Sequence, residues 1–125
     1  MKKVIAVVGL GLIGGSLAAA LKGFEDYEVV GVVRRQETLD YALEHGVCDR
    51  GTLDAAEALA EADVTFLCTA PSIVIRYLKE YKDVYKPGSL VTDVCGIKTA
   101  IMKASQVLPP QVDFIGCHPM AGTEF

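Results

Sequence analysis

Three glycines near the N-terminus have the spacing of a loop that binds dinucleotides. They form the pattern GxGxxG over residues 9–14, between the β-branched run 4–8 and an Ala- and Leu-rich segment at 12–22. In such a loop the first glycine permits a tight turn, the second lets the backbone approach a pyrophosphate, and the third lets a helix pack closely on a strand. The free N–H groups at the helix start then bind the phosphates. This context favours a dinucleotide site over a purely structural turn, with contacts from Gly9, Gly11, Leu12, Ile13 and Gly14.

The end of the second apolar run decides between NAD and NADP. An acidic residue there would accept hydrogen bonds from the ribose 2′-hydroxyl of NAD, but the chain has Val33, followed by Arg34 and Arg35. Guanidinium groups attract the 2′-phosphate of NADP, whereas a carboxylate repels it. We therefore predict NADP as the favoured cofactor and NAD as the other candidate. Two alternatives stay open: the arginines are solvated strand-end residues, or one of them stacks on adenine without selecting a phosphate.

His118 is the residue best suited to acid–base chemistry. It directly follows the last predicted strand, and Pro119 restricts the path of the chain beyond it. A neutral imidazole beside a nicotinamide can accept a hydroxyl proton as hydride departs. Isolated histidines are more often structural or on the surface, but a place at the cofactor edge favours catalysis. The other histidine, His45, ends a predicted helix, where an interaction with the helix dipole is a sufficient explanation.

The scaffold that positions these residues alternates short apolar runs with longer amphipathic segments. The apolar runs predict strands at 4–8, 28–34, 47–48, 64–68, 89–93 and 112–117. The amphipathic segments predict helices at 12–22, 36–44, 54–62, 72–81 and 98–107. This alternation predicts an α/β fold, a Rossmann-type doubly wound parallel sheet of about six strands. Ligands bind such sheets outside the carboxyl ends of the strands, which adds Thr69, Ala70, Pro71 and Asp93 to the predicted cofactor contacts.

Composition excludes several classes of protein. The chain has 125 residues, of which 51% are hydrophobic, enough for a sizeable core, and its net charge is −4 without a block of like charges. A nucleic-acid partner and a membrane segment are therefore not expected. The cysteines at 48, 68, 95 and 117 form no CxxC pair, so we expect no metal site, reduced thiols, a cytoplasmic location, and Cys68 in a strand core. Tyr77, Tyr81 and Tyr85 recur every four residues, which is typical of a packed helix face rather than a binding platform.

Three segments occur in order along the chain: VGLGLIGGSL at 8–17, VTDVCGIK at 91–98 and GCHPMAGTE at 116–124. With these segments the chain resembles the prephenate dehydrogenase family, which includes the arogenate dehydrogenases. The first is shared by many dehydrogenases, whereas the His-Pro-Met-Ala-Gly block is much more specific. The resemblance covers the family's N-terminal nucleotide-binding domain, so we expect residues 1–125 to form one dinucleotide-binding domain. The family's C-terminal helical domain, which dimerises and completes the substrate site, is expected to lie outside this chain.

The resemblance implies an oxidoreductase of tyrosine biosynthesis. The family oxidises and decarboxylates prephenate or arogenate and transfers a hydride to NAD or NADP. Its catalytic histidine maps onto His118, and its small-molecule substrate would contact Gly96, His118, Met120, Gly122 and Thr123. Gly96 departs from the family's usual serine, for which Cys95, Thr99 or a water are the substitutes. A homodimer formed through the helical domain is expected, and the isolated domain is expected to be inactive.

Two other functions fit the same glycine loop. A nucleotide-sensing regulatory module would have this size and no chemistry, but it needs no histidine-proline loop at the cofactor edge. Another oxidoreductase, such as a short 2-hydroxyacid or ketopantoate-type reductase, would place a lysine catalyst on a later helix. The segment from His118 to Glu124 argues against both.

Overall fold

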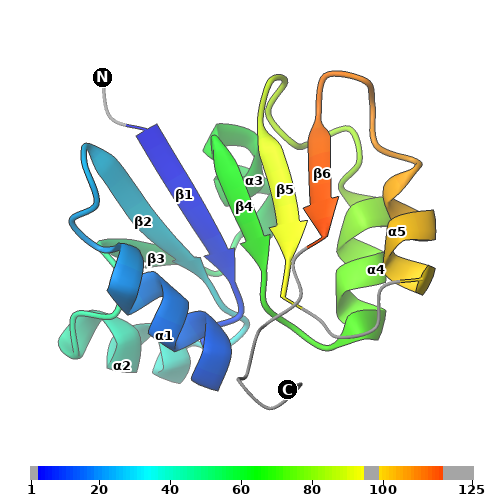
Figure 1. The fold of residues 1–125 in the computed structure, drawn as a ribbon. Coiled ribbons are helices and arrows are strands. Elements are labelled where there is room, and N and C mark those ends of the chain that lie inside the picture. The colour runs from blue at the N-terminus through cyan, green and yellow to red at the C-terminus, as the bar shows by residue number, and fades with distance from the viewer. Residues whose placement is uncertain (1–2, 95–98, 117–125) are drawn as a thin grey trace, which may run out of the picture.

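The fold comes from a computed structural model, which describes residues 3–94 and 99–116. In these residues one parallel sheet is connected by helices on both of its faces (Figure 1). The strands are β1 (Lys3–Val8), β2 (Tyr27–Val32), β3 (Arg50–Thr52), β4 (Val64–Leu67), β5 (Leu90–Asp93) and β6 (Asp113–Gly116). The helices are α1 (Leu12–Leu21), α2 (Gln36–Glu44), α3 (Ala55–Glu61), α4 (Pro71–Glu80) and α5 (Thr99–Ser105).

The strand order is β3-β2-β1-β4-β5-β6. This order confirms the predicted doubly wound sheet of six strands. The chain runs from β1 outwards through β2 and β3, then returns and continues from β4 to the other edge. The direction therefore reverses between β1 and β4, and ligands of open α/β sheets bind at such a switch point.

The central strand explains why its sequence is continuously apolar. β1 pairs with β2 on one side and with β4 on the other, so that Val8 lies level with Val32 and Leu67. Residues 4–8 are all buried, as expected for a strand that is covered on both faces. Since three strands end at one level, the loops that follow them gather at a single edge.

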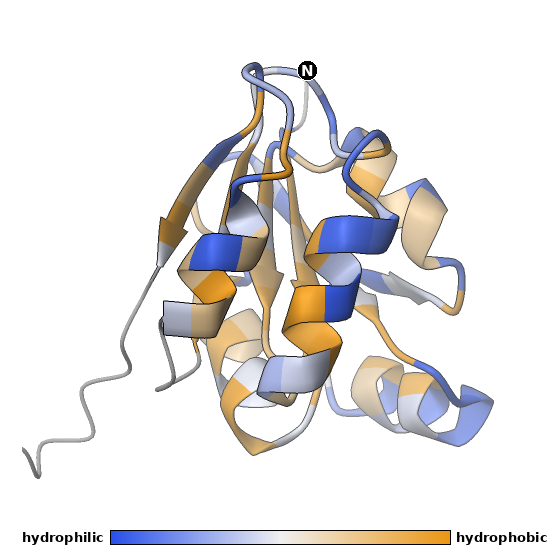
Figure 2. Ribbon diagram, turned by 90° about the vertical axis from the view of Figure 1, so that its right-hand side faces the viewer, coloured by the Kyte–Doolittle hydropathy of each residue, from blue (hydrophilic) through white to orange (hydrophobic). Residues whose placement is uncertain are grey.

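Alternate side chains of β1 enter two separate cores. Ile5 and Val7 face a cluster with Ala18 of α1 and Ala42 of α2. Ala6 and Val8 face a larger cluster with residues of α3, α4 and α5, among them Leu59, Leu78 and Ile101. The period of two along the strand produces these two layers. Figure 2 shows the matching alternation of hydrophobic and hydrophilic colours around the helices.

Two sequence predictions about elements are wrong. The third strand, predicted at 47–48, is β3 at Arg50–Thr52. Val47 lies in the turn that follows α2, where its N–H donates to the Ala42 carbonyl, and Cys48 is buried in the core. The strand itself is polar, and Arg50 pairs there with Glu28 and Glu61 at 2.9 and 2.6 Å. Cys68, predicted inside a strand, is half-buried just beyond the end of β4.

None of the helices in the described part of the chain is both long and apolar enough to cross a bilayer. The tyrosines pack together as predicted, but they do not form one helix face, because Tyr81 is the C-cap of α4 and Tyr85 lies beyond it. Tyr77 and Tyr85 are buried, and the Tyr85 hydroxyl donates to the Tyr77 carbonyl at 3.0 Å. The ring of Tyr81 lies 5.0 Å from that of Tyr77.

Candidate functional site

The glycine loop between β1 and α1 is held by close backbone contacts. Gly9 has a φ of +88°, and a Cβ there would lie 2.7 Å from the Cys68 carbonyl oxygen. A Cβ at Gly14 would lie 1.8 Å from the Gly9 carbonyl oxygen. A side chain at Gly9 would therefore push the loop away from the end of β4, and one at Gly14 would push α1 away from the loop.

Gly11 differs from the other two glycines because it faces open space. A Cβ at Gly11 would meet no atom within 4 Å. Gly11 is the N-cap of α1, without a side-chain capping bond, and the first turn of α1 contains no acidic residue. The first N–H groups of a helix have no acceptor within it and carry partial positive charge. The open, uncharged cradle therefore fits a pyrophosphate that lies against the backbone.

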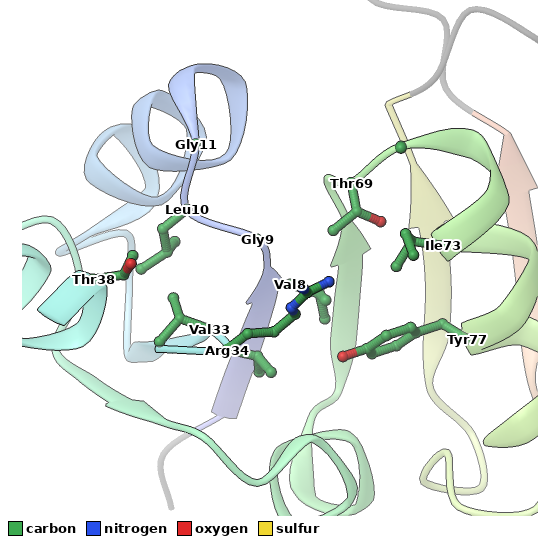
Figure 3. Close-up of a pocket in the computed structure, with 12 residues that line it drawn as sticks. Val8, Gly9, Leu10, Gly11, Val33, Arg34, Thr38, Thr69, Ile73 and Tyr77 are labelled. Atoms are coloured by element: carbon green, nitrogen blue, oxygen red, sulfur yellow. The ribbon is translucent and has the colours of Figure 1, made fainter. Parts of the chain in front are cut away.

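A cavity of about 400 Å³ lies on the β2 side of this loop. Figure 3 shows its walls, which come from the glycine loop, the end of β2, α2, the β4–α4 loop and α4. The predicted cofactor residues that line it are Gly9, Gly11, Arg34, Thr69 and Ala70. The cavity lies at the switch point between β1 and β4, as the sheet topology predicts for a ligand site.

A second cavity of about 460 Å³ adjoins the first. It reaches past the end of β5 to Val94, and the predicted cofactor residues that line it are Gly11, Leu12, Ile13, Gly14, Thr69, Ala70 and Pro71. The two cavities share Gly11, Thr69 and Ala70. A dinucleotide has two halves that join at a pyrophosphate, and two cavities that meet at Gly11 match this shape.

The two arginines have different positions. Arg34 extends over the first cavity from the end of β2 (Figure 3), whereas Arg35 is the N-cap of α2 and lines neither cavity. No carboxylate in the described residues forms an ion pair with either arginine. Thr38, in the first turn of α2, also lines the first cavity. Thr38 was not predicted from the sequence, although its place three residues after Arg35, at the start of a helix, was a usable signal.

Asp93 is fully buried at the end of β5, level with Leu67 and Gly116. It lines neither cavity, but its neighbour Val94 lines the second. The other predicted site residues, Gly96, His118, Met120, Gly122 and Thr123, lie outside the described residues.

Tyr77 and Ile73 complete the first cavity from α4 and were also missed as site residues. Burial raises the pKa of the Tyr77 hydroxyl, and the nearby Arg34 charge opposes this rise. Tyr77 thus combines a packed ring with a place in the cavity wall. The four-residue spacing of the tyrosines predicted only their packing. This spacing does not indicate that α4 lies beside the carboxyl ends of the strands, where the cavity is.

The reversed strand order, the glycine loop and the paired cavities define a Rossmann-type nucleotide-binding domain. Residues 17–125 match the model of the prephenate dehydrogenase nucleotide-binding domain, and the chain belongs to this family.

Known proteins of the family are similar over nearly the whole chain. A prephenate dehydrogenase of Lactococcus lactis is 34% identical over 127 aligned residues, which cover 98% of this chain and 35% of that protein. Arogenate dehydrogenase from Synechocystis has a TM-score of 0.83 and 40% identity, covering 98% of this chain and 42% of the solved one. Prephenate dehydrogenase from A. aeolicus, solved with hydroxyphenyl propionate and NAD+, has a TM-score of 0.81 and 27% identity, with coverages of 100% and 44%. The chain therefore spans less than half the length of these relatives.

Proposed function

We propose that this chain is the nucleotide-binding domain of an NADP-dependent prephenate or arogenate dehydrogenase. The proposed reaction is an oxidative decarboxylation in tyrosine biosynthesis. The observation that carries the proposal is the pair of cavities that meet at Gly11 on the switch point, in a chain of this family. The regulatory module without catalysis has no comparable support.

The glycine loop would hold the cofactor by its pyrophosphate. The N–H groups at the start of α1 point out of the helix and lack internal acceptors. Gly11 leaves room for the phosphates, and exposed Leu12 and Ile13 border the second cavity, which would receive the nicotinamide half. The bound nicotinamide supplies the hydride acceptor. Thr69, Ala70 and Pro71 would fix the middle of the cofactor from the β4–α4 loop.

NADP is the cofactor that the first cavity favours over NAD. Arg34 borders this cavity and forms no ion pair with a carboxylate of the described residues, and Thr38 lies in the same wall. A 2′-phosphate there would accept hydrogen bonds from the guanidinium and the hydroxyl. Arg35 adds positive charge at the start of α2 without lining the cavity. We therefore assign the 2′-phosphate chiefly to Arg34, with Thr38 as the additional contact.

The catalytic and substrate residues are assigned from the family pattern. His118 would hold the substrate hydroxyl and accept its proton as the carbonyl forms. Gly96, Met120, Gly122 and Thr123 would contact the substrate beside it. Loss of the carboxylate makes the ring aromatic, so the protein's contribution is orientation and proton removal. We further propose a homodimer in the cytoplasm, whose helical domain lies outside residues 1–125.

The decisive experiment measures reduced cofactor by absorbance with the full-length protein. Prephenate and arogenate are each combined with NADP and with NAD. We expect reduction with at least one substrate, and a lower KM for NADP than for NAD. Cofactor binding without reduction in all four mixtures would instead favour the regulatory module. A lower KM for NAD would refute the assignment of Arg34.

A further inference from the structure

The hydroxyl group of Tyr77 lies in the wall of the first cavity. Tyr77 is 9% exposed and lines the cavity from α4. Figure 3 shows the hydroxyl end of its ring directed into the space between α4 and the end of β2. Within the described residues the Tyr77 hydroxyl forms no hydrogen bond, and only the Tyr77 carbonyl accepts one from a side chain. Phenol groups in protein interiors normally have a polar partner, and a ligand in this cavity can supply one to Tyr77.

The position of Tyr77 indicates which part of a dinucleotide it meets. The pyrophosphate is assigned to Gly11, and the adenosine ribose lies by Arg34 and Thr38. Helix α4 contributes Ile73 and Tyr77 to the wall of the same cavity, and Tyr77 is the only aromatic residue among those that line it. Resting on the proposed function, we infer that Tyr77 is the residue that binds the adenine base of the cofactor, through its ring and its hydroxyl.

The chemistry of Tyr77 suits a purine. Its ring offers a flat apolar surface, and Ile73 adds an aliphatic contact in the same wall. The edge of adenine presents an amino donor and ring-nitrogen acceptors. A phenol hydroxyl can both donate and accept, so it can pair with either kind of group. No charged side chain is needed at this end of the cavity, since adenine is neutral.

The ring of Tyr77 is held in place before any ligand arrives. The hydroxyl of Tyr85, which is 3% exposed, donates to the Tyr77 carbonyl at 3.0 Å. The ring of Tyr81 packs against that of Tyr77 with an angle of 50° between the planes. Tyr85 thus anchors the backbone at Tyr77, and Tyr81 contacts its ring, so little conformational entropy is lost when a ligand binds there.

The test titrates the full-length protein with the two halves of the cofactor. The adenine half is 2′-phospho-ADP-ribose, and the nicotinamide half is nicotinamide mononucleotide. In Tyr77→Phe the ring remains and one hydrogen bond is lost, so the Kd of the adenine half should rise about two- to tenfold. The Kd of the mononucleotide should not change. A structural disturbance of α4 would not separate the halves in this way.

Tyr81→Phe is the matched control. It removes a hydroxyl from the adjacent ring, which does not line the cavity, so neither Kd should change. Equal Kd values for wild type and Tyr77→Phe would overturn the inference and leave the proposed function intact. A rise in both Kd values of Tyr77→Phe would also overturn it. A wild type that binds neither NADP nor 2′-phospho-ADP-ribose would instead refute the proposed function.

Discussion

Gly14→Ala and Gly11→Ala should separate stability from binding within one loop. A Cβ at position 14 would lie 1.8 Å from the Gly9 carbonyl oxygen and 3.0 Å from its carbon, while real Cβ atoms keep at least 3.0 Å. Helix α1 must therefore move by at least about 1.2 Å, which is the difference between the 3.0 Å limit and the 1.8 Å from the Cβ to the carbonyl oxygen. The Cβ position is set by the backbone of α1, and the atom it meets is the backbone carbonyl oxygen of Gly9, so no side-chain rotation can relieve the contact.

The expected cost of Gly14→Ala is about 3 kcal/mol, the upper end of the range for overpacking. At an m-value of about 2 kcal/mol/M this lowers the urea midpoint by about 1.5 M. At Gly11 the same methyl group meets no atom within 4 Å, and its φ of −72° is accessible to alanine. The change in stability should stay within about 1 kcal/mol, the typical effect of an N-cap substitution.

The methyl group of Gly11→Ala would instead occupy the space assigned to the pyrophosphate. We expect the Kd for NADP to rise about fivefold or more, because a steric cost of about 1–3 kcal/mol corresponds to a factor of about 5 to 150. Urea unfolding followed by circular dichroism and calorimetric titration with NADP measure the two effects. If Gly14→Ala is as stable as the wild type, the packing argument is refuted. Normal binding by Gly11→Ala would refute the phosphate assignment.

Three further predictions concern charge and catalysis. Arg34→Asp should lower the preference for 2′-phospho-ADP-ribose over ADP-ribose by about tenfold or more in calorimetric titration, through loss of a charge-assisted contact; an unchanged preference would contradict the role of Arg34. His118→Asn should abolish turnover in the absorbance assay and leave the Kd for NADP unchanged, so surviving turnover would exclude His118 as the base. Lys86, at 2.6 Å, and the Val4 N–H lower the pKa of Asp63. The ionised Asp63 therefore stabilises the fold fully above the unfolded-state pKa of about 4. This stabilisation is lost as the pH falls through the lower folded-state pKa. Asp63→Asn should therefore cost about 1 kcal/mol in urea unfolding at pH 7 and less at pH 3, and a constant difference would contradict the ion-pair argument.

Strand position was predictable where burial dictates residue type. Residues 4–8 are β-branched or small because β1 is covered on both faces and paired on both edges. The position of β3 was predicted wrongly because it is a polar strand at the edge of the sheet. Arg50 of β3 forms ion pairs with Glu28 on the adjacent strand β2 and with Glu61 on α3. Such contacts between distant residues leave no periodic signal along the chain.

The doubly wound fold, the glycine loop and the cationic end of β2 could be predicted from the sequence, since each depends on local residue spacing or on the alternation of buried and exposed residues. Which distant residues line the same cavity depends on the three-dimensional fold. It brings Arg34 to the cavity wall and leaves Arg35 as a helix cap. It also brings Tyr77, more than 40 positions further along the chain, to the same cavity as Arg34. The physical reason is the reversal between β1 and β4, which places the end of β2 and the start of α4 around one loop.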